Sequence, residues 1–195
     1  MDALRSLAEA ISSLTTSFVV PSFAFFALFY PSSNALLLIM SSFSFFCFIP
    51  YIFGKHAVKM GWMKSLDEIG KIARSKGFMV LTPVFVIGLI ILIALNAPPE
   101  GIAFALAILA NNFIAITILG KEKISLHMMA SAGTMALFNL VFGVSFLITL
   151  IVLSAVAFAR LYLKRHSVKE VLEGGFIGYV VTWIIMFLVL ERGNV

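Results

Sequence analysis

Long apolar stretches alternate with short polar segments along this chain. A helix needs about 20 mostly apolar residues to cross the hydrocarbon layer of a bilayer, and most of the stretches approach that length. The pattern predicts an all-α, polytopic membrane helix bundle with about seven transmembrane helices, at residues 17–30, 35–53, 78–95, 102–119, 125–142, 146–163 and 171–190. The count depends on a break at Gly143-Val-Ser145, so a bundle of six spans stays open as an alternative.

The residues before the first stretch follow a different pattern. Between residues 2 and 14, apolar side chains recur every three or four positions, opposite Arg5, Glu9 and Ser12. This spacing is typical of an amphipathic helix. We expect a short interfacial helix that lies on the membrane surface.

The longest polar segment, residues 54–77, predicts a loop that contains a short surface helix. Ser65-Leu-Asp-Glu68 has the capping-box pattern that opens a helix, and Gly77 is placed to end it. Lys71 and Arg74 lie on one face of that helix. They either add positive charge to an anion site or form a solvated basic face beside anionic lipid.

Polar and small residues inside the apolar stretches indicate contacts between helices. Buried amides are costly in a bilayer, so Asn111 and Asn112 either bridge helices or face a polar cavity. Small residues let helix backbones approach closely. We therefore expect close packing at residues 130–134 and through Gly174, Gly175 and Gly178.

Composition excludes an ordinary soluble domain. Of the 195 residues, 62% are hydrophobic and 12% are charged, which fits one integral-membrane domain over residues 1–195. The net charge of +5 favours anionic membrane lipids as partners, and no segment has the pattern of a nucleic-acid-binding module. All 14 Lys and Arg residues except Arg192 fall on the side of the membrane that holds the N-terminus in a seven-span arrangement. The positive-inside rule predicts that this side is cytoplasmic.

The polar segment before the last span holds the strongest candidate chemistry. Arg160 offers a planar fork of donors to a phosphate. His166 is a titratable nucleophile, and Glu170 is a carboxylate that can orient its imidazole. Ser167 and Glu170 also form an S-x-x-E pattern, so a plain capping box at the start of the last helix is the structural alternative.

This spacing resembles the third signature motif of the type 2 phosphatidic acid phosphatase superfamily, in which Ser-Arg, a His and an Asp precede a glycine-containing helix. Ala159 and Glu170 stand here in place of that Ser and Asp. Upstream, Ser125-Leu-His127 resembles the second motif, Pro-Ser-Gly-His, without its Pro and Gly. The first motif, a Lys followed seven residues later by Arg-Pro, is absent from the sequence. The phosphatase-like region is therefore residues 120–175.

The resemblance implies a metal-independent lipid phosphatase that needs no cofactor. His166 would attack phosphorus and form a phosphohistidine, Glu170 would hold its tautomer, and His127 would protonate the leaving lipid oxygen. The residues that would bind phosphoryl oxygens are cations and a hydroxyl donor: Arg160, Ser125, Lys123, Lys71 and Arg74. The substrate would be a lipid phosphate or a polyprenyl diphosphate whose tail stays in the bilayer.

Three other interpretations stay open. The same phosphohistidine could pass its phosphoryl group to an alcohol, which would make the protein a lipid phosphotransferase. The altered motif flanks favour a catalytically silent member or a small membrane transporter. The last alternative is a metal site formed by His56, His127 and His166, although no carboxylates accompany them at ligand spacing.

Overall fold

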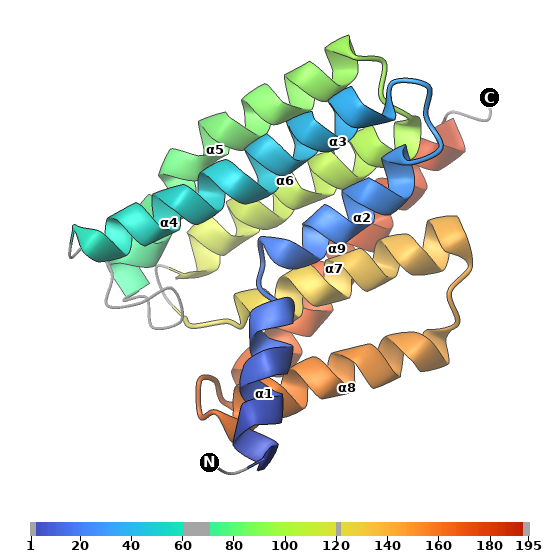
Figure 1. Ribbon diagram of the computed structural model, residues 1–195. Coiled ribbons are helices and arrows are strands. Elements are labelled where there is room, and N and C mark those ends of the chain that lie inside the picture. The colour runs from blue at the N-terminus through green and yellow to red at the C-terminus, as the bar shows by residue number, and fades with distance from the viewer. Residues whose placement is uncertain (1–2, 61–70, 120–121, 193–195) are drawn as a thin grey trace.

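The computed structural model describes residues 3–60, 71–119 and 122–192, with side chains described throughout except at 71–76, 119 and 192. Within these ranges the chain forms helices, turns and connectors and no strand. The helices are α1 (Ala3–Leu14), α2 (Val19–Phe29), α3 (Ala35–Phe43), the π-helical segment η1 (Ser44–Phe48), α4 (Ile49–Lys59), α5 (Lys71–Ala94), α6 (Pro99–Leu119), α7 (Leu126–Phe142), α8 (Phe146–Tyr162) and α9 (Val168–Arg192). Figure 1 shows a bundle of long helices that run side by side, with α1 lying across one end.

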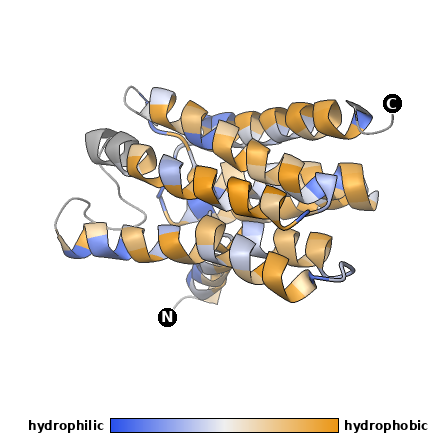
Figure 2. Ribbon diagram, turned by 90° about the horizontal axis from the view of Figure 1, so that it is seen from above, coloured by the Kyte–Doolittle hydropathy of each residue, from blue (hydrophilic) through white to orange (hydrophobic). Residues whose placement is uncertain are grey.

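The bundle is that of a helical membrane protein. Among the described residues, four stretches are long and apolar enough to cross a membrane: Ala35–Lys59, Gly77–Ala94, Pro99–Ile118 and Val168–Glu191. Helices α1 and α2 together form a fifth candidate, with a bend of 53° between them. Helices α7 and α8 are apolar but have 17 residues each. The helices are mostly hydrophobic along their lengths (Figure 2).

The structure confirms the predicted break between α7 and α8. Gly143 adopts a left-handed backbone with φ of 64°, which ends α7. The hydroxyl of Ser145 then caps α8 by accepting a hydrogen bond from the Ile148 N–H at 3.4 Å. Local backbone chemistry is therefore sufficient to place this turn.

Two expectations about the long polar loop are wrong. Gly77 does not end a short helix, because α5 runs through it without interruption. A glycine in a helix costs only about 1 kcal/mol relative to alanine, which the long apolar sequence after it outweighs. The preceding helix also reaches Lys59 rather than ending at Phe53, so the connector is shorter than predicted. The expected capping box at 65–68 lies outside the described residues.

Helices α7 and α9 share the most extensive contact in the described structure. At Gly174, an added Cβ would lie 2.5 Å from the carbonyl oxygen of Ser125. At Gly178, an added Cβ would overlap the carbonyl group of Met129. The predicted close packing through the glycines of the last helix is confirmed, and it brings the backbones of α7 and α9 together.

The other half of the bundle packs around aromatic rings. Phe25, Phe46, Phe85 and Phe104 are buried, and the rings of Phe46 and Phe85 stack with 5.7 Å between their centroids. These rings come from α2, η1, α5 and α6. Their large apolar surfaces hold these four elements together.

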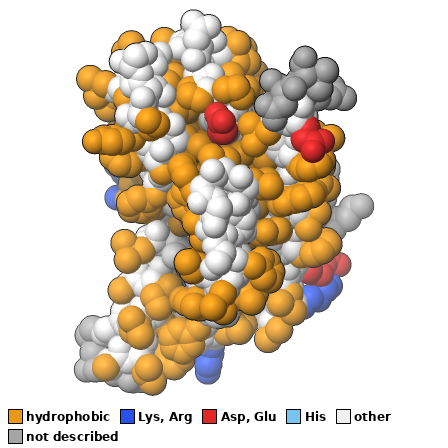
Figure 3. Space-filling view, turned by 90° about the vertical axis from the view of Figure 1, so that its right-hand side faces the viewer, with side chains coloured by type: hydrophobic (Ala, Val, Ile, Leu, Met, Phe, Trp, Pro, Cys, Tyr) orange, Lys and Arg blue, Asp and Glu red, His pale blue; other side chains and the backbone are white. Residues whose placement is uncertain are grey.

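The polar connectors gather at one end of the bundle. This end lies to the left in Figure 1, where α4 ends, α5 begins and the connectors α6–α7 and α8–α9 lie near α1. The opposite end faces the viewer in Figure 3 and shows mostly hydrophobic and uncharged side chains. The segments that carry the candidate site residues therefore meet at one end.

We expect Gly178→Ala to lower the free energy of unfolding by about 1–3 kcal/mol, the usual range for overpacking, because its methyl group overlaps the Met129 carbonyl. Gly77→Ala is the matched control, since its Cβ would lie 4.0 Å from the Phe53 ring and alanine favours a helix. Unfolding of both variants in mixed detergent micelles measures the difference. Equal stability of the two variants would contradict the close packing of α7 and α9.

Candidate active site

The loop between α8 and α9 folds back over the end of α8. The carbonyl oxygen of Arg160 accepts hydrogen bonds from the backbone N–H groups of Arg165 at 3.0 Å and His166 at 3.4 Å. Lys164 has a left-handed backbone, with φ of 53°, at the reversal of the chain. This turn holds the backbone of His166 against that of Arg160.

Glu170 holds the imidazole of His166 from the first turn of α9. Its Oε2 lies 2.7 Å from His166 Nδ1 and accepts a hydrogen bond from the Ser167 N–H at 3.3 Å. The hydroxyl of Ser167 accepts in return from the Glu170 N–H at 3.3 Å. The capping box and the histidine–carboxylate pair therefore coexist, and the cap fixes the carboxylate that orients the imidazole.

The start of α7 is bonded directly to the start of α9. The Ser125 N–H donates to the carbonyl oxygen of Glu170 at 3.0 Å. Ser125 occupies the N-cap position of α7, but its hydroxyl makes no capping bond. This hydroxyl is buried and has no hydrogen-bond partner among the described residues. A buried polar atom of this kind calls for a partner, and a ligand oxygen would supply one.

Lys123 supports the loop from the connector before α7. Its Nζ donates to the carbonyl oxygen of Arg165 at 2.9 Å and lies 4.0 Å from Glu170 Oε2. The sequence suggests a phosphate ligand at this position. In the structure, the ammonium group holds the α8–α9 loop beside Glu170, and its role as a phosphate ligand stays a prediction.

Arg160 is buried, with 1% of its surface exposed. Its Nη1 donates to the Ser12 hydroxyl of α1 at 2.7 Å. Helix α1 packs against α8 and buries Ala8 and Ser12, whereas its leucines are exposed. The predicted amphipathic helix therefore has one face on the protein, where it covers the candidate phosphate-binding arginine.

A polar cavity of about 380 Å³ lies beside these residues. Its wall includes His127 from the start of α7 and Arg165 from the α8–α9 loop. Arg160 is joined to the wall through Ser12, which lines the cavity. His166 follows Arg165 directly but is not part of the wall, and 4% of its side chain is exposed. The remaining wall residues come mainly from α1 and its connection to α2: Glu9, Ser13, Thr16, Ser17, Phe18, Tyr51 and Leu163.

Burial lowers the pKa of His166 from its usual 6.5 to about 4. The charges of Arg160 and Lys123 act in the same direction, while the hydrogen bond and charge of Glu170 oppose them. The imidazole is therefore neutral at neutral pH. Because a carboxylate accepts from Nδ1, the proton lies on Nδ1 and the lone pair on Nε2.

Of the other predicted ligands, only His56 has a described side chain. The side chains of Lys71 and Arg74 lie outside the described residues. His56 is exposed on α4. No three His, Cys, Asp or Glu side chains among the described residues are grouped to hold a metal ion, so the alternative metal site of His56, His127 and His166 does not form.

Sequence reasoning missed the part that α1 plays in the site. Its periodicity correctly separates the leucines from Glu9 and Ser12, but it predicts only a helix that lies on the membrane surface. In the structure, these two residues line the cavity. The polar side of the helix was the signal, and its partner could be identified only from the packing of α1 on α8.

None of the protein families, curated proteins and solved structures with which the chain was compared matches it. The chemistry open to this site follows from its own arrangement. A neutral imidazole with an orienting carboxylate lies beside a buried guanidinium, and a second histidine lines the adjacent cavity.

We expect His166 to titrate near pH 4, because burial and two neighbouring cations disfavour its charged form. NMR of ¹⁵N-histidine-labelled protein measures this midpoint, with His166→Ala to assign the signal. Lys123→Gln should raise the midpoint, since it removes one of these cations. Lys164→Gln, which removes an exposed cation of the same loop, should change the midpoint less than Lys123→Gln does. A wild-type midpoint at 6.5 or above would contradict the buried, neutral imidazole.

Proposed function

We propose that the protein is a membrane lipid phosphatase, which hydrolyses a phosphate monoester or diphosphate of a lipid or polyprenyl substrate through a phosphohistidine at His166. The observation that carries this proposal is the contact of 2.7 Å between His166 Nδ1 and Glu170 Oε2. This pair lies beside a buried arginine and a polar cavity. The proposal also agrees with the resemblance of residues 120–175 to the type 2 phosphatidic acid phosphatase superfamily.

In this mechanism, His166 is the nucleophile. The lone pair on its Nε2 attacks phosphorus, and the bond between phosphorus and the lipid oxygen breaks. His127 gives its proton to that oxygen, and the lipid leaves as an alcohol or a lipid phosphate. Water then attacks the phosphohistidine, His127 takes the water's proton, and the nitrogen–phosphorus bond breaks to release phosphate. Glu170 stabilises the positive charge on the imidazole during the attack.

Arg160 and Ser125 bind the phosphoryl oxygens in this proposal. A guanidinium matches the geometry of a phosphate. The Ser125 hydroxyl has no hydrogen-bond partner among the described residues, so it is available to bind a phosphate oxygen. Ser12 holds Nη1 of Arg160 in this structure. The phosphate oxygen therefore replaces the Ser12 hydroxyl when substrate binds, which requires α1 to shift relative to α8.

The proposed topology has seven membrane spans and places the site and the N-terminus in the cytoplasm. Helices α7 and α8, at 17 residues, are each about 25 Å long at 1.5 Å per residue, close to the roughly 30 Å of the hydrocarbon layer. The excess of Lys and Arg at the site end supports the cytoplasmic orientation. A substrate lipid would keep its tail in the bilayer while its phosphate enters the polar cavity.

The test is phosphate release by purified protein from phosphatidic acid, phosphatidylglycerophosphate and farnesyl diphosphate, with EDTA present. We expect release from at least one substrate and none from His166→Ala, which lacks the nucleophile. His127→Ala should lower kcat by about 10²–10⁴-fold, the range for general acid–base catalysis. His56→Ala is the control, because this exposed histidine lies outside the site, and it should act as wild type does.

Two results would overturn the proposal. Release that His166→Ala does not reduce would place the chemistry on another residue. A folded wild-type protein that releases phosphate from none of the three substrates would favour the catalytically silent or transport alternative.

A further inference from the structure

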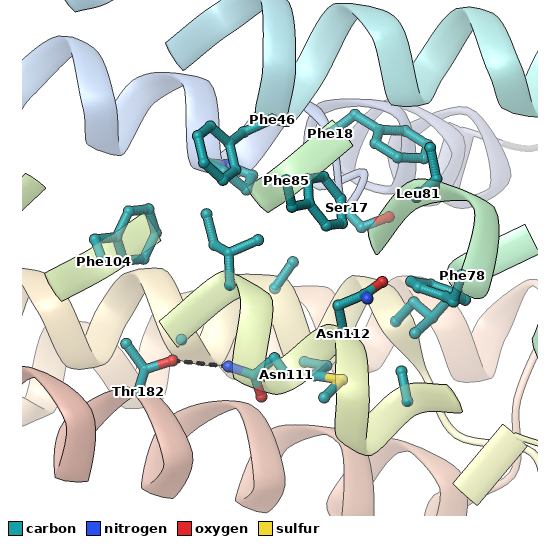
Figure 4. A pocket seen from close by; sticks show the side chains of 17 residues that line it. Ser17, Phe18, Phe46, Phe78, Leu81, Phe85, Phe104, Asn111, Asn112 and Thr182 are labelled. Atoms are coloured by element: carbon teal, nitrogen blue, oxygen red, sulfur yellow. Dashed lines mark hydrogen bonds between the residues drawn. The ribbon is translucent and has the colours of Figure 1, made fainter. Parts of the chain in front are cut away.

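A second cavity lies inside the bundle next to the polar one, and we call it the inner chamber. Its volume is about 90 Å³, and Ser17 and Phe18 belong to the walls of both cavities. Most of its wall is apolar and comes from α5, α6 and α7, with several phenylalanine rings turned towards it (Figure 4). The inner chamber therefore borders the polar cavity and lies in the hydrophobic part of the bundle.

One polar atom of Asn112 in this apolar wall has no partner. Asn112 is 3% exposed, and its Nδ2 donates to Thr82 Oγ1 at 2.8 Å. The Thr82 hydroxyl gives its own hydrogen to the carbonyl oxygen of Phe78 at 3.0 Å, so towards Asn112 it can only accept. This fixes the orientation of the amide. Its Oδ1 is left without a hydrogen-bond partner among the described residues, and the amide points into the chamber (Figure 4).

Asn111, the neighbouring residue, repeats this arrangement. Its Nδ2 donates to the carbonyl oxygen of Ala107 at 2.9 Å and to Thr182 Oγ1 at 3.1 Å. Its Oδ1 is buried and likewise unpartnered within the described ranges. Both amides thus bridge helices, as the sequence allowed, and both also line the chamber. Each contributes an acceptor oxygen, and both N–H groups of Asn111 are already in hydrogen bonds.

A buried acceptor without a partner costs about 1–3 kcal/mol, and a ligand with a hydrogen-bond donor removes that cost. A pure hydrocarbon chain has no donor. A water between the two amide oxygens would supply donors, but it would leave the aromatic and aliphatic wall of the chamber without an apolar partner. A hydroxyl on an apolar chain satisfies both requirements, because it donates one hydrogen while its chain contacts the rings.

We infer that the inner chamber is a binding site for a single-chain lipid alcohol, whose hydroxyl donates to Asn112 Oδ1 and whose chain packs against the phenylalanine rings. The volume of about 90 Å³, on a scale where one water needs roughly 10–15 Å³, has room for roughly six to nine groups of that size, enough for a segment of one chain. A single-chain alcohol is also what the proposed hydrolysis of a polyprenyl monoester would release next to the chamber. Only this biological role, not the site itself, rests on the proposed function.

The test compares dodecan-1-ol with its methyl ether, which has the same chain and no donor. The protein is held in lipid nanodiscs, and each Kd comes from the rise in unfolding temperature with ligand concentration. We expect the ratio of the ether Kd to the alcohol Kd to be about tenfold larger in wild type than in Asn112→Leu, the effect of one hydrogen bond. The comparison of ratios cancels the different partitioning of the two probes into lipid.

Thr117→Val is the matched control, because Thr117 lies exposed on the same helix and its hydroxyl bonds only within that helix. It should keep the wild-type ratio. His166→Ala should keep it too, which separates alcohol binding from the proposed phosphatase activity. An unchanged ratio in Asn112→Leu, or no saturable binding of the alcohol to wild type, would overturn the inference. If Asn112→Leu does not fold, equal Kd values for alcohol and ether in wild type would overturn it.

Discussion

The close packing of α7 against α9 determines where the proposed catalytic groups lie. Gly174 lets the backbone of α9 approach the carbonyl group of Ser125, and the Ser125 N–H bonds to the carbonyl oxygen of Glu170. Both helices begin at this contact. His127 on α7 and Glu170 on α9 therefore lie at the same end of the bundle. The direct contact between the starts of the two helices places them there. A larger side chain at Gly174 would separate the two halves of the site without altering any catalytic group.

Burial then gives these groups their chemistry. Ionisable groups are costly in a low-dielectric interior unless each is hydrogen-bonded or paired, and here Glu170 contacts His166 while Arg160 donates to Ser12. The same burial keeps the imidazole neutral, as a nucleophile must be. Helix α1 is consequently part of the site. Its leucines are exposed to the membrane surface in the proposed topology, so the position of α1 in the lipid and the access of an anion to Arg160 are linked.

The sequence predicts the features that depend on local spacing. The amphipathic α1, the break at Gly143, the pairing of His166 with Glu170 and the glycine contacts of α9 all follow from residue types a few positions apart. Contacts across the bundle do not follow in this way, because the bond between Arg160 and Ser12 joins residues 148 positions apart and no local pattern marks it. At Gly77 the local pattern itself misleads. A glycine that predicts the end of a helix lies inside α5, because the long apolar sequence after it favours a continuous helix.

The covalent intermediate tests the central claim most directly. Wild-type protein would be mixed with a substrate that it hydrolyses, quenched in alkali, where phosphohistidine is stable, and digested for mass spectrometry. The account predicts an added phosphoryl group on the peptide that contains His166. If loss of His127 slows the attack of water on the phosphohistidine more than it slows formation of the phosphohistidine, His127→Ala should carry more of this group than wild type. A phosphoryl group on any other residue, or turnover by a folded protein that never carries one, would contradict it.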